Sequence, residues 1–155
     1  MNIDRFTEKA QEAILGARNL AQRLGHQTIE PEHILAALLE NDNDVAPTMI
    51  QKAGADLGAL RDRLKKEIGR FPKVSGAGEP RFGPRFNSVV MKAEDESKAM
   101  KDDFVAVEHL LLAVAEDSAV ARLFKELNLT RDRLLAGMRE VRGNQRVTSQ
   151  NPEGT

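Results

Sequence analysis

An internal duplication is the feature of this 155-residue sequence that most restricts its fold. Residues 28–41, TIEPEHILAALLEN, align with residues 104–117, FVAVEHLLLAVAED, at an offset of 76, and residues 53–64 align with residues 127–138. The first alignment pairs Glu32, His33, Ala37 and Glu40 with Glu108, His109, Ala113 and Glu116. A repeat of about 75 residues is longer than solenoid units of roughly 20 to 50 residues, so it indicates a duplicated small domain.

The apolar residues of the first unit have the spacing of helices. Those near the start recur every three or four positions: Phe6, Ala10, Ala13, Ala17, Leu20 and Leu24. This spacing predicts a helix with one buried stripe, which Thr7 can cap and Gly25 can end. Pro31 suits the first turn of a second helix, a third starts after Asp44, and a fourth opens at Asp56.

The second unit has the same plan, so we predict an all-α fold of two pseudo-symmetric four-helix repeats. The first repeat is residues 1–70, the Gly- and Pro-rich linker is residues 71–83, and the second repeat is residues 84–142. Cores of fewer than about 70 to 80 residues are marginally stable, so the two repeats should pack together. Residues 143–155 contain one large apolar side chain, Val147, which predicts a flexible tail.

Composition excludes several functions. The chain has no cysteine, which removes disulfides, thiolate metal sites and thiol nucleophiles. Lys and Arg number 23 against 24 Asp and Glu, and there is no Trp or Tyr, so neither a basic field nor stacking platforms favour nucleic acid. No run of 18 apolar residues and no signal-peptide pattern occurs, so we expect no membrane partner and a cytoplasmic location.

The repeated Glu-His pair has two interpretations. Glu30-x-x-His33 has the spacing of di-iron carboxylate bundles, which need this motif on two helices and two further glutamates. The second copy has Ala106 where Glu30 would recur, so the context of a metal site is missing. We therefore favour a helix start in which the Glu is stabilised by the helix dipole and the His packs against a neighbouring helix. The sequence predicts no metal site.

Catalytic motifs are also absent. The sequence has no G-x-x-x-x-G-K-[ST] loop, no G-x-S-x-G and no S-x-x-K. Gly76 and Gly78 lie in a proline-flanked linker with no strand before them, unlike a dinucleotide-binding turn. We predict a binding module that is not itself an enzyme and needs no cofactor.

The paired segments FTEKAQEAILGA, IEPEHILAALLE and VEHLLLAV resemble the Clp amino-terminal domain, the substrate-side module of ring-forming protein-unfolding ATPases. EVRGNQRVTSQNPE at 140–153 is similar to the junction that leads into the first ATPase domain in ClpB-type disaggregases. The resemblance implies a parent protein that is an ATP-binding homohexamer working with the DnaK system. In that parent, this module would bind exposed apolar segments of unfolded or aggregated clients in a shallow groove and deliver them to the ATPase ring.

The resemblance also implies five substrate-binding residues: Thr7, Val90, Asp102, Glu108 and His109. Thr7, Asp102 and Glu108 match family positions that affect chaperone function, although a capping, helix-starting or helix-ending role would explain each of them as well. Val90 and His109 match positions that line the apolar client groove. Because Val89 already lies in the core stripe, Val90 is a surplus apolar residue that indicates a surface patch.

Two other functions remain open at this stage. The surface could receive a folded adaptor protein or a modified residue, as in ClpA and ClpC, rather than an unfolded chain. A helix-turn-helix nucleic-acid binder could use the basic residues Arg131, Arg133, Arg139 and Arg142, although acidic residues lie among them. A steep loss of affinity with salt would identify the nucleic-acid binder.

Overall fold

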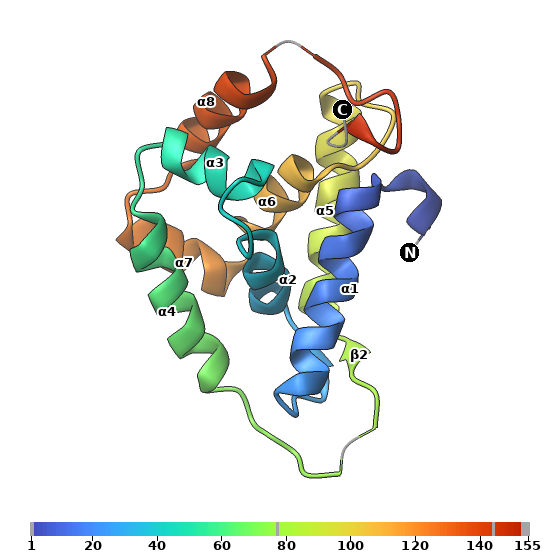
Figure 1. The fold of residues 1–155 in the computed structure, drawn as a ribbon, viewed down its shortest axis with the longest axis vertical. Helices are drawn as coiled ribbons and strands as arrows, with labels where there is room; N and C mark the ends of the chain where they lie inside the picture. The colour runs from blue at the N-terminus through green and yellow to red at the C-terminus, as the bar shows by residue number, and fades with distance from the viewer. Residues whose placement is uncertain (1, 77, 144, 153–155) are drawn as a thin grey trace.

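The computed structural model describes residues 2–76, 78–143 and 145–152, and Figure 1 shows their arrangement. The first repeat contains a 3-10 turn η1 (Ile3–Arg5) and helices α1 (Glu8–Arg23), α2 (Pro31–Leu38), α3 (Val45–Lys52) and α4 (Leu57–Gly69). The second repeat contains α5 (Pro84–Ala99), α6 (Val107–Val114), α7 (Ser118–Glu126) and α8 (Arg131–Arg142). The predicted all-α fold is confirmed.

The helix ends follow local sequence signals. The Thr7 hydroxyl accepts a hydrogen bond from the Ala10 N–H at 3.2 Å, and the Asp56 carboxylate accepts one from the Ala59 N–H at 3.1 Å. Such caps satisfy backbone donors that the first turn of a helix leaves unpaired. After α1 and α3 the chain turns at Gly25 and Gly54, whose φ angles of 76° and 88° suit glycine. The predicted signals at Thr7, Asp56 and Gly25 therefore act as expected.

Short extended segments join the repeats to each other. Strand β1 (Thr28–Ile29) pairs in parallel with β2 (Arg81–Phe82), and Phe6 forms a parallel bridge with Val105. Phe6 and Phe82 are 76 residues apart (82 − 6), and so are Ile29 and Val105 (105 − 29). The residues that precede the first helix of each repeat thus pair with the segment that precedes the second helix of the other repeat. This reciprocal exchange makes the molecule pseudo-twofold symmetric.

The core lies where the two repeats meet. All eight residues of α6 are buried, and α2 and α6 contact each other between the longer helices (Figure 1). Helix α8 of the second repeat packs closely on α3 of the first. One continuous apolar cluster extends through both repeats, from Phe6 to Met138. The repeats are therefore halves of one folded unit, in line with the limited core that a single repeat can build.

Two predicted connections differ from the structure. The end of the predicted linker 71–83 is extended and paired, because Arg81 and Phe82 form β2. The prediction of a flexible tail is wrong for residues 145–152: Val147 is only 4% exposed, and its N–H donates to the Asp102 carboxylate at 2.8 Å. Farther along, the Gln150 carbonyl accepts from the Glu8 N–H at 2.6 Å. Residue 77 of the linker and residues 144 and 153–155 of the tail lie outside the described residues.

Gly137 should be essential to the contact between repeats. A Cβ at this position would collide with the Met49 carbonyl oxygen of α3, which is backbone and cannot rotate away. We expect Gly137→Ala to destabilise the chain by about 1 to 3 kcal/mol despite the better helix propensity of alanine. Urea unfolding of the variant measures this loss. As a matched control, Gly69→Ala at the open end of α4 meets no neighbour within 4 Å and should leave stability unchanged or raise it; equal effects of the two variants would contradict the proposed close contact.

Candidate functional site

The repeated histidine closes the start of a helix in both repeats. The Nδ1 atom of His33 accepts a hydrogen bond from the Glu30 N–H at 2.9 Å, and Nδ1 of His109 accepts one from the Ala106 N–H at 2.8 Å. Each histidine is the third residue of its helix and reaches back to the N-cap, where a glutamate or glutamine acts in the usual capping box. The repeated Glu-His pair is therefore a capping device, and both rings are fully buried.

These bonds also fix where the ring protons lie. Because Nδ1 accepts a backbone N–H, the neutral ring must carry its hydrogen on Nε2 and donate from there. Nε2 of His109 lies 2.7 Å from Oδ2 of Asp102, and Nε2 of His33 lies 2.9 Å from Nδ1 of His26. Seven residues separate the members of each pair, and the pairs occupy the same place in the two repeats. Both repeats thus contain a hydrogen-bonded pair at equivalent positions. The buried capping histidine is common to both, but its partner is His26 in the first repeat and Asp102 in the second.

Burial keeps the histidines neutral in the folded protein. It lowers the pKa of His33 to about 4, with a further contribution from the neighbouring His26. Burial also lowers the pKa of His26, aided by Lys73. The pKa of His109 is lowered by burial, and the carboxylates of Glu108 and Asp102 oppose this shift only in part. Neutral rings are required here, because a protonated Nδ1 could not accept the N-cap hydrogen bond.

In the second repeat, Asp102 is the centre of a buried polar network. Its carboxylate accepts two hydrogen bonds of 2.8 Å from the Arg142 guanidinium and one from the Val147 N–H, in addition to the His109 contact. The same guanidinium donates to Glu108 at 3.1 Å. Burial raises the pKa of Asp102, but the bonds from Arg142, Val147 and His109 together hold it below its usual value. The network ties the end of α8 and the tail to the start of α6.

In the first repeat, Glu32 corresponds to Glu108 and is paired with a different arginine, Arg85. Arg85 of α5 lies 3.1 Å from both carboxylate oxygens of Glu32 and donates to Asp117 at 2.7 Å. The hydrogen bonds that Arg85 donates to Asp117 are the main cause that raises the pKa of Arg85. Glu32 and Glu108 are both buried and charge-paired. Among the described residues, no group of three or more metal-ligating side chains is arranged to hold a metal ion.

The structure places all five predicted binding residues in the interior. Asp102, Glu108 and His109 lie together in the network around Arg142, whereas Thr7 caps α1 and Val90 lies in the core cluster. The predicted surface patch at Val90 is wrong, because both Val89 and Val90 are buried. Val89 and Val90 follow the buried Phe86 by three and four residues, so a single apolar stripe of α5 holds both valines. Client contact by these five residues stays a prediction, and such contact would require local opening.

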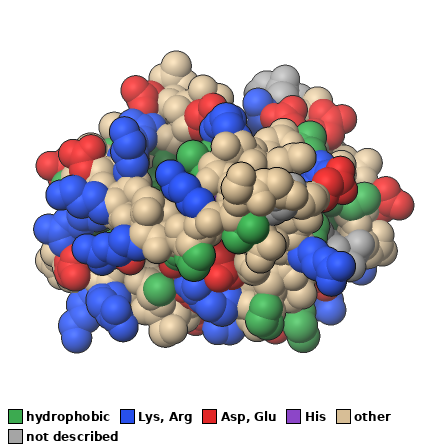
Figure 2. All heavy atoms as spheres, turned by 90° about the horizontal axis from the view of Figure 1, so that it is seen from below, with side chains coloured by type: hydrophobic (Ala, Val, Ile, Leu, Met, Phe, Trp, Pro, Cys, Tyr) green, Lys and Arg blue, Asp and Glu red, His purple; other side chains and the backbone are tan. Residues whose placement is uncertain are grey.

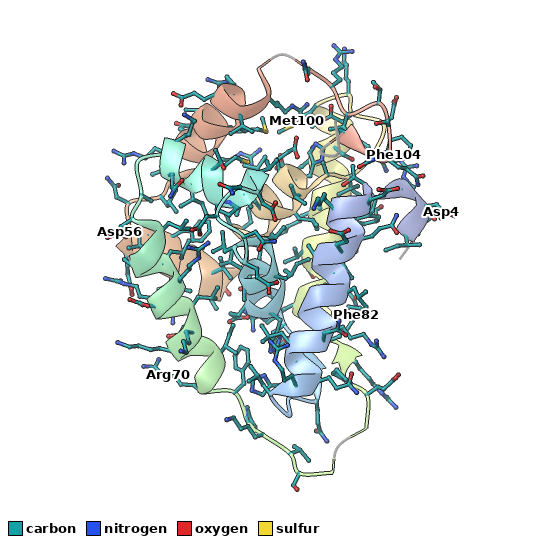
Figure 3. The ribbon with its side chains drawn as sticks, viewed as in Figure 1. Asp4, Asp56, Arg70, Phe82, Met100 and Phe104 are labelled. Atoms are coloured by element: carbon teal, nitrogen blue, oxygen red, sulfur yellow. The ribbon has the colours of Figure 1, made fainter. Side chains whose placement is uncertain are left out.

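An exposed apolar groove lies elsewhere, along the outer face of α1. This α1 groove has a volume of about 510 Å³ and is lined by Ile3, Glu8, Gln11, Glu12, Ile14, Leu15, Arg18 and Phe82. Leu15 is 53% exposed, Ile3 39% and Phe82 37%, and Phe82 lies beside α1 (Figure 3). The side-chain amide of Gln11 donates hydrogen bonds to the carbonyls of Ile3 and Phe6, which fixes the segment before α1 against this helix. Contiguous exposed apolar side chains of this kind mark interaction surfaces.

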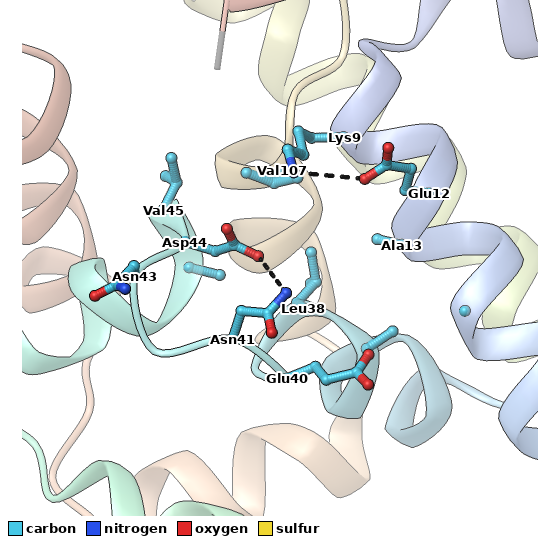
Figure 4. A pocket seen from close by; sticks show the side chains of 13 residues that line it. Lys9, Glu12, Ala13, Leu38, Glu40, Asn41, Asn43, Asp44, Val45 and Val107 are labelled. Carbon is cyan, nitrogen blue, oxygen red and sulfur yellow. Dashed lines mark hydrogen bonds and ion pairs between the residues drawn. The ribbon is translucent and has the colours of Figure 1, made fainter. Parts of the chain in front are cut away.

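A second hollow, of about 210 Å³, opens between α1, the α2–α3 connection and the start of α6 (Figure 4). Charged and amide side chains surround it, including Lys9, Glu12, Asn41 and Asp44. Lys9 and Glu12 pair at 3.6 Å, and the Asn41 amide donates to Asp44 at 3.5 Å. Its polar rim suits an apolar chain less well than the α1 groove does.

Sequence reasoning missed the α1 groove, although one signal was present. Leu15 lies off the buried stripe of α1 that runs through Ala10, Ala13 and Ala17, so the helical period alone places it on the surface. Phe82 had no such signal. It comes from the linker, and its position beside α1 depends on the pairing of β1 with β2.

The fold defines a class of all-α modules built from two pseudo-symmetric four-helix repeats. The model of the Clp repeat (R) N-terminal domain matches residues 5–127. The chain is 38% identical to the chaperone protein ClpB of Nitratidesulfovibrio vulgaris and 38% identical to that of Bacillus cereus, over 100% of this chain in each case. It covers 19% and 18% of those proteins, so it spans about a fifth of their length. In structure it resembles the Hsp104 N-terminal domain from Candida albicans, with a TM-score of 0.84 and 28% identity over 94% of this chain and 96% of that one.

The chain therefore belongs to the Clp repeat N-terminal domain family, and its relatives are ClpB-type chaperones. The matched residues extend across both halves of the duplication found in the sequence. No helix in the described part of the chain has the length and apolar character needed to cross a membrane.

The buried histidines should make stability depend on pH. Unfolding restores the ordinary pKa of about 6.5 to His33, so below that pH the unfolded chain binds a proton that the folded chain does not. The stabilisation is complete above pH 6.5 and is lost as the pH falls toward about 4, by up to about 3 kcal/mol for this residue. Urea unfolding at several pH values measures the slope. The double variant His26→Leu/His33→Gln keeps a cap acceptor and should have a flatter profile; parallel profiles would contradict the assignment.

Proposed function

We propose that this chain is the substrate-recognition domain of a ClpB-type disaggregase and binds exposed apolar segments of unfolded or aggregated proteins in the α1 groove. The observation that carries the proposal is the group of exposed apolar side chains, Ile3, Leu15 and Phe82, which line one open groove. A monomeric domain gains nothing by exposing such a group to water, so a binding role explains it.

The size of the groove sets the strength of binding. Burying about 300 Å² of apolar surface would contribute roughly 7 kcal/mol at about 25 cal/mol per Å². Association costs about 4 to 15 kcal/mol in lost freedom, which offsets most of that gain. One domain should therefore bind a client weakly, and several linked copies would be needed for firm capture. This is the behaviour expected of a domain that repeats around a ring.

The wider assignment rests on the relatives. In the proposal, the parent protein is a homohexameric ATPase that receives clients from this domain and works with the DnaK system in the cytoplasm. The domain itself contributes binding and no catalysis. The docked tail supports a defined geometry of delivery, because the Gln150 carbonyl bonds to the Glu8 N–H at one end of the α1 groove.

Titration of the isotopically labelled chain with an unfolded model client tests the proposal. With reduced and carboxymethylated α-lactalbumin, we expect resonance shifts to cluster at Ile3, Leu15 and Phe82. The double variant Leu15→Glu/Phe82→Ser should weaken binding about tenfold or more, because each lost apolar contact contributes about 1.5 to 3 kcal/mol when fully buried.

The matched control is Met91→Glu on α5. Met91 is 67% exposed and does not line the α1 groove, so this change should leave client affinity unaltered. Equal losses for the two variants, or shifts that avoid the groove, would refute the proposal. Saturation at one folded partner per chain, with no response to unfolded client, would instead support the adaptor-docking alternative.

A further inference from the structure

A third hollow lies inside the first repeat, on the side of α1 away from Leu15. It has a volume of about 460 Å³, within the range of about 300 to 1,000 Å³ that is typical of ligand pockets. We call it the repeat-1 hollow. Its apolar wall comes from α1, α2 and α4: Leu20, Leu24, Ala36, Leu39, Leu64 and Ile68.

One polar side chain in this wall has an unused hydrogen-bonding atom. His26 lines the hollow and is only 3% exposed, and its Nδ1 already accepts from His33. In the neutral ring the hydrogen must then be on Nε2, which has no partner among the described residues. A buried donor without an acceptor costs about 1 to 3 kcal/mol. The first repeat therefore has one buried N–H without an acceptor, on a residue that borders the hollow.

The second repeat shows what fills the equivalent position. Residue 102 is residue 26 plus the repeat offset of 76, and Asp102 pairs with His109 as His26 pairs with His33. Asp102 receives the Val147 N–H at 2.8 Å, and the Val147 side chain is buried there. The second repeat thus holds an extended segment of its own tail, joined to this residue by a backbone hydrogen bond. In the first repeat the residue equivalent to Val147 is Phe71, whose ring lies 5.4 Å from that of His26, and Nε2 of His26 has no hydrogen-bond partner in the described part of the chain.

Charge at the rim adds a preference. Arg61, Lys65 and Lys73 line the hollow against a single acidic residue, Glu40. Figure 2 views this end of the molecule and shows Lys and Arg side chains gathered on one side of it. Arg61 is held by the Leu39 carbonyl and Asp42, but Lys65 and Lys73 have no ion pair within the described ranges. An acidic side chain beside an apolar one would complement this rim.

We propose that the repeat-1 hollow is a second peptide-binding site, which takes an extended apolar segment flanked by an acidic residue. An apolar side chain enters between α1, α2 and α4, a backbone carbonyl of the segment accepts from Nε2 of His26, and the acidic residue lies near Lys65 and Lys73. This inference rests on the proposed function, because it assumes that the domain binds unfolded clients.

A blocked peptide, acetyl-Asp-Leu-Val-Leu-Ser-amide, tests the site on the labelled chain. We expect shifts at Leu20 and Leu24 and a changed resonance of the His26 Nε2–H, which a purely structural role of His26 would not produce. A twin peptide with Lys in place of Asp should bind about threefold more weakly.

Two variants separate the contributions. Leu24→Gln removes an apolar wall residue and should reduce affinity about tenfold, whereas Leu15→Gln on the opposite face of α1 should not affect peptide binding in the hollow. The double variant Lys65→Glu/Lys73→Glu changes only exposed side chains, so it should fold normally and prefer the Lys peptide. Unchanged peptide preference in this variant would refute the charge assignment.

The outcomes distinguish this site from the α1 groove. Peptide shifts limited to Leu15 and Phe82, with none at Leu24 or His26, would overturn the second site and leave the proposed function intact. Shifts at Leu24 and His26 that survive Leu15→Glu/Phe82→Ser would establish the hollow even if the α1 groove failed. The absence of any response to both peptide and unfolded client would refute both.

Discussion

The hydrogen bond from an N-cap N–H to a buried histidine ring is the constraint on which much of this fold depends. It fixes the turn before α2 and the turn before α6, at Glu30 and Ala106. The residues just ahead of these turns, Ile29 and Val105, are the ones that pair with the other repeat. A ring that lost its cap contact would therefore disturb the helix start and the junction between repeats together. The same bond also forces the other ring nitrogen to find a buried partner.

The partner of the histidine Nε2 differs between the two repeats, and this difference accounts for their asymmetry. Asp102 is an anion with capacity for several donors, so burial is tolerable only with Arg142 and the Val147 N–H close by. These partners hold the end of α8 and the tail against the start of α6. His26 is neutral, so it needs no paired cation; it holds one hydrogen bond to His33, and its ring lies 5.4 Å from that of Phe71 in the linker. A single difference between equivalent positions thus gives the second repeat a charged network with the tail and the first repeat an aromatic contact with the linker.

The helices were predictable because their signals are local. Apolar spacing located α1, and the capping residues Thr7 and Asp56 located the starts of α1 and α4. The site was not predictable in the same way, since contacts between segments far apart in the sequence decide which surface stays open. Val90 was expected at the surface because Val89 already lay in the core stripe, but the two residues follow Phe86 by three and four positions and fit one buried stripe. The prediction of a flexible tail was wrong for a similar reason, because the backbone N–H of Val147 donates to Asp102, which is 45 residues away in the sequence.

The positions of the two proposed grooves on α1 bear on how a client could be held. Leu15 and Leu24 are nine residues apart (24 − 15), which corresponds to roughly 13 Å along a helix and about half a turn of net rotation. One rigid surface cannot reach both, because they face opposite ways. An extended chain, at about 3.3 Å per residue, can pass around the end of α1 within several residues. Two weak contacts on one flexible client would then act at high effective concentration. A folded protein could not gain in this way, so the two proposed sites together would favour unfolded chains by geometry as well as by apolar character.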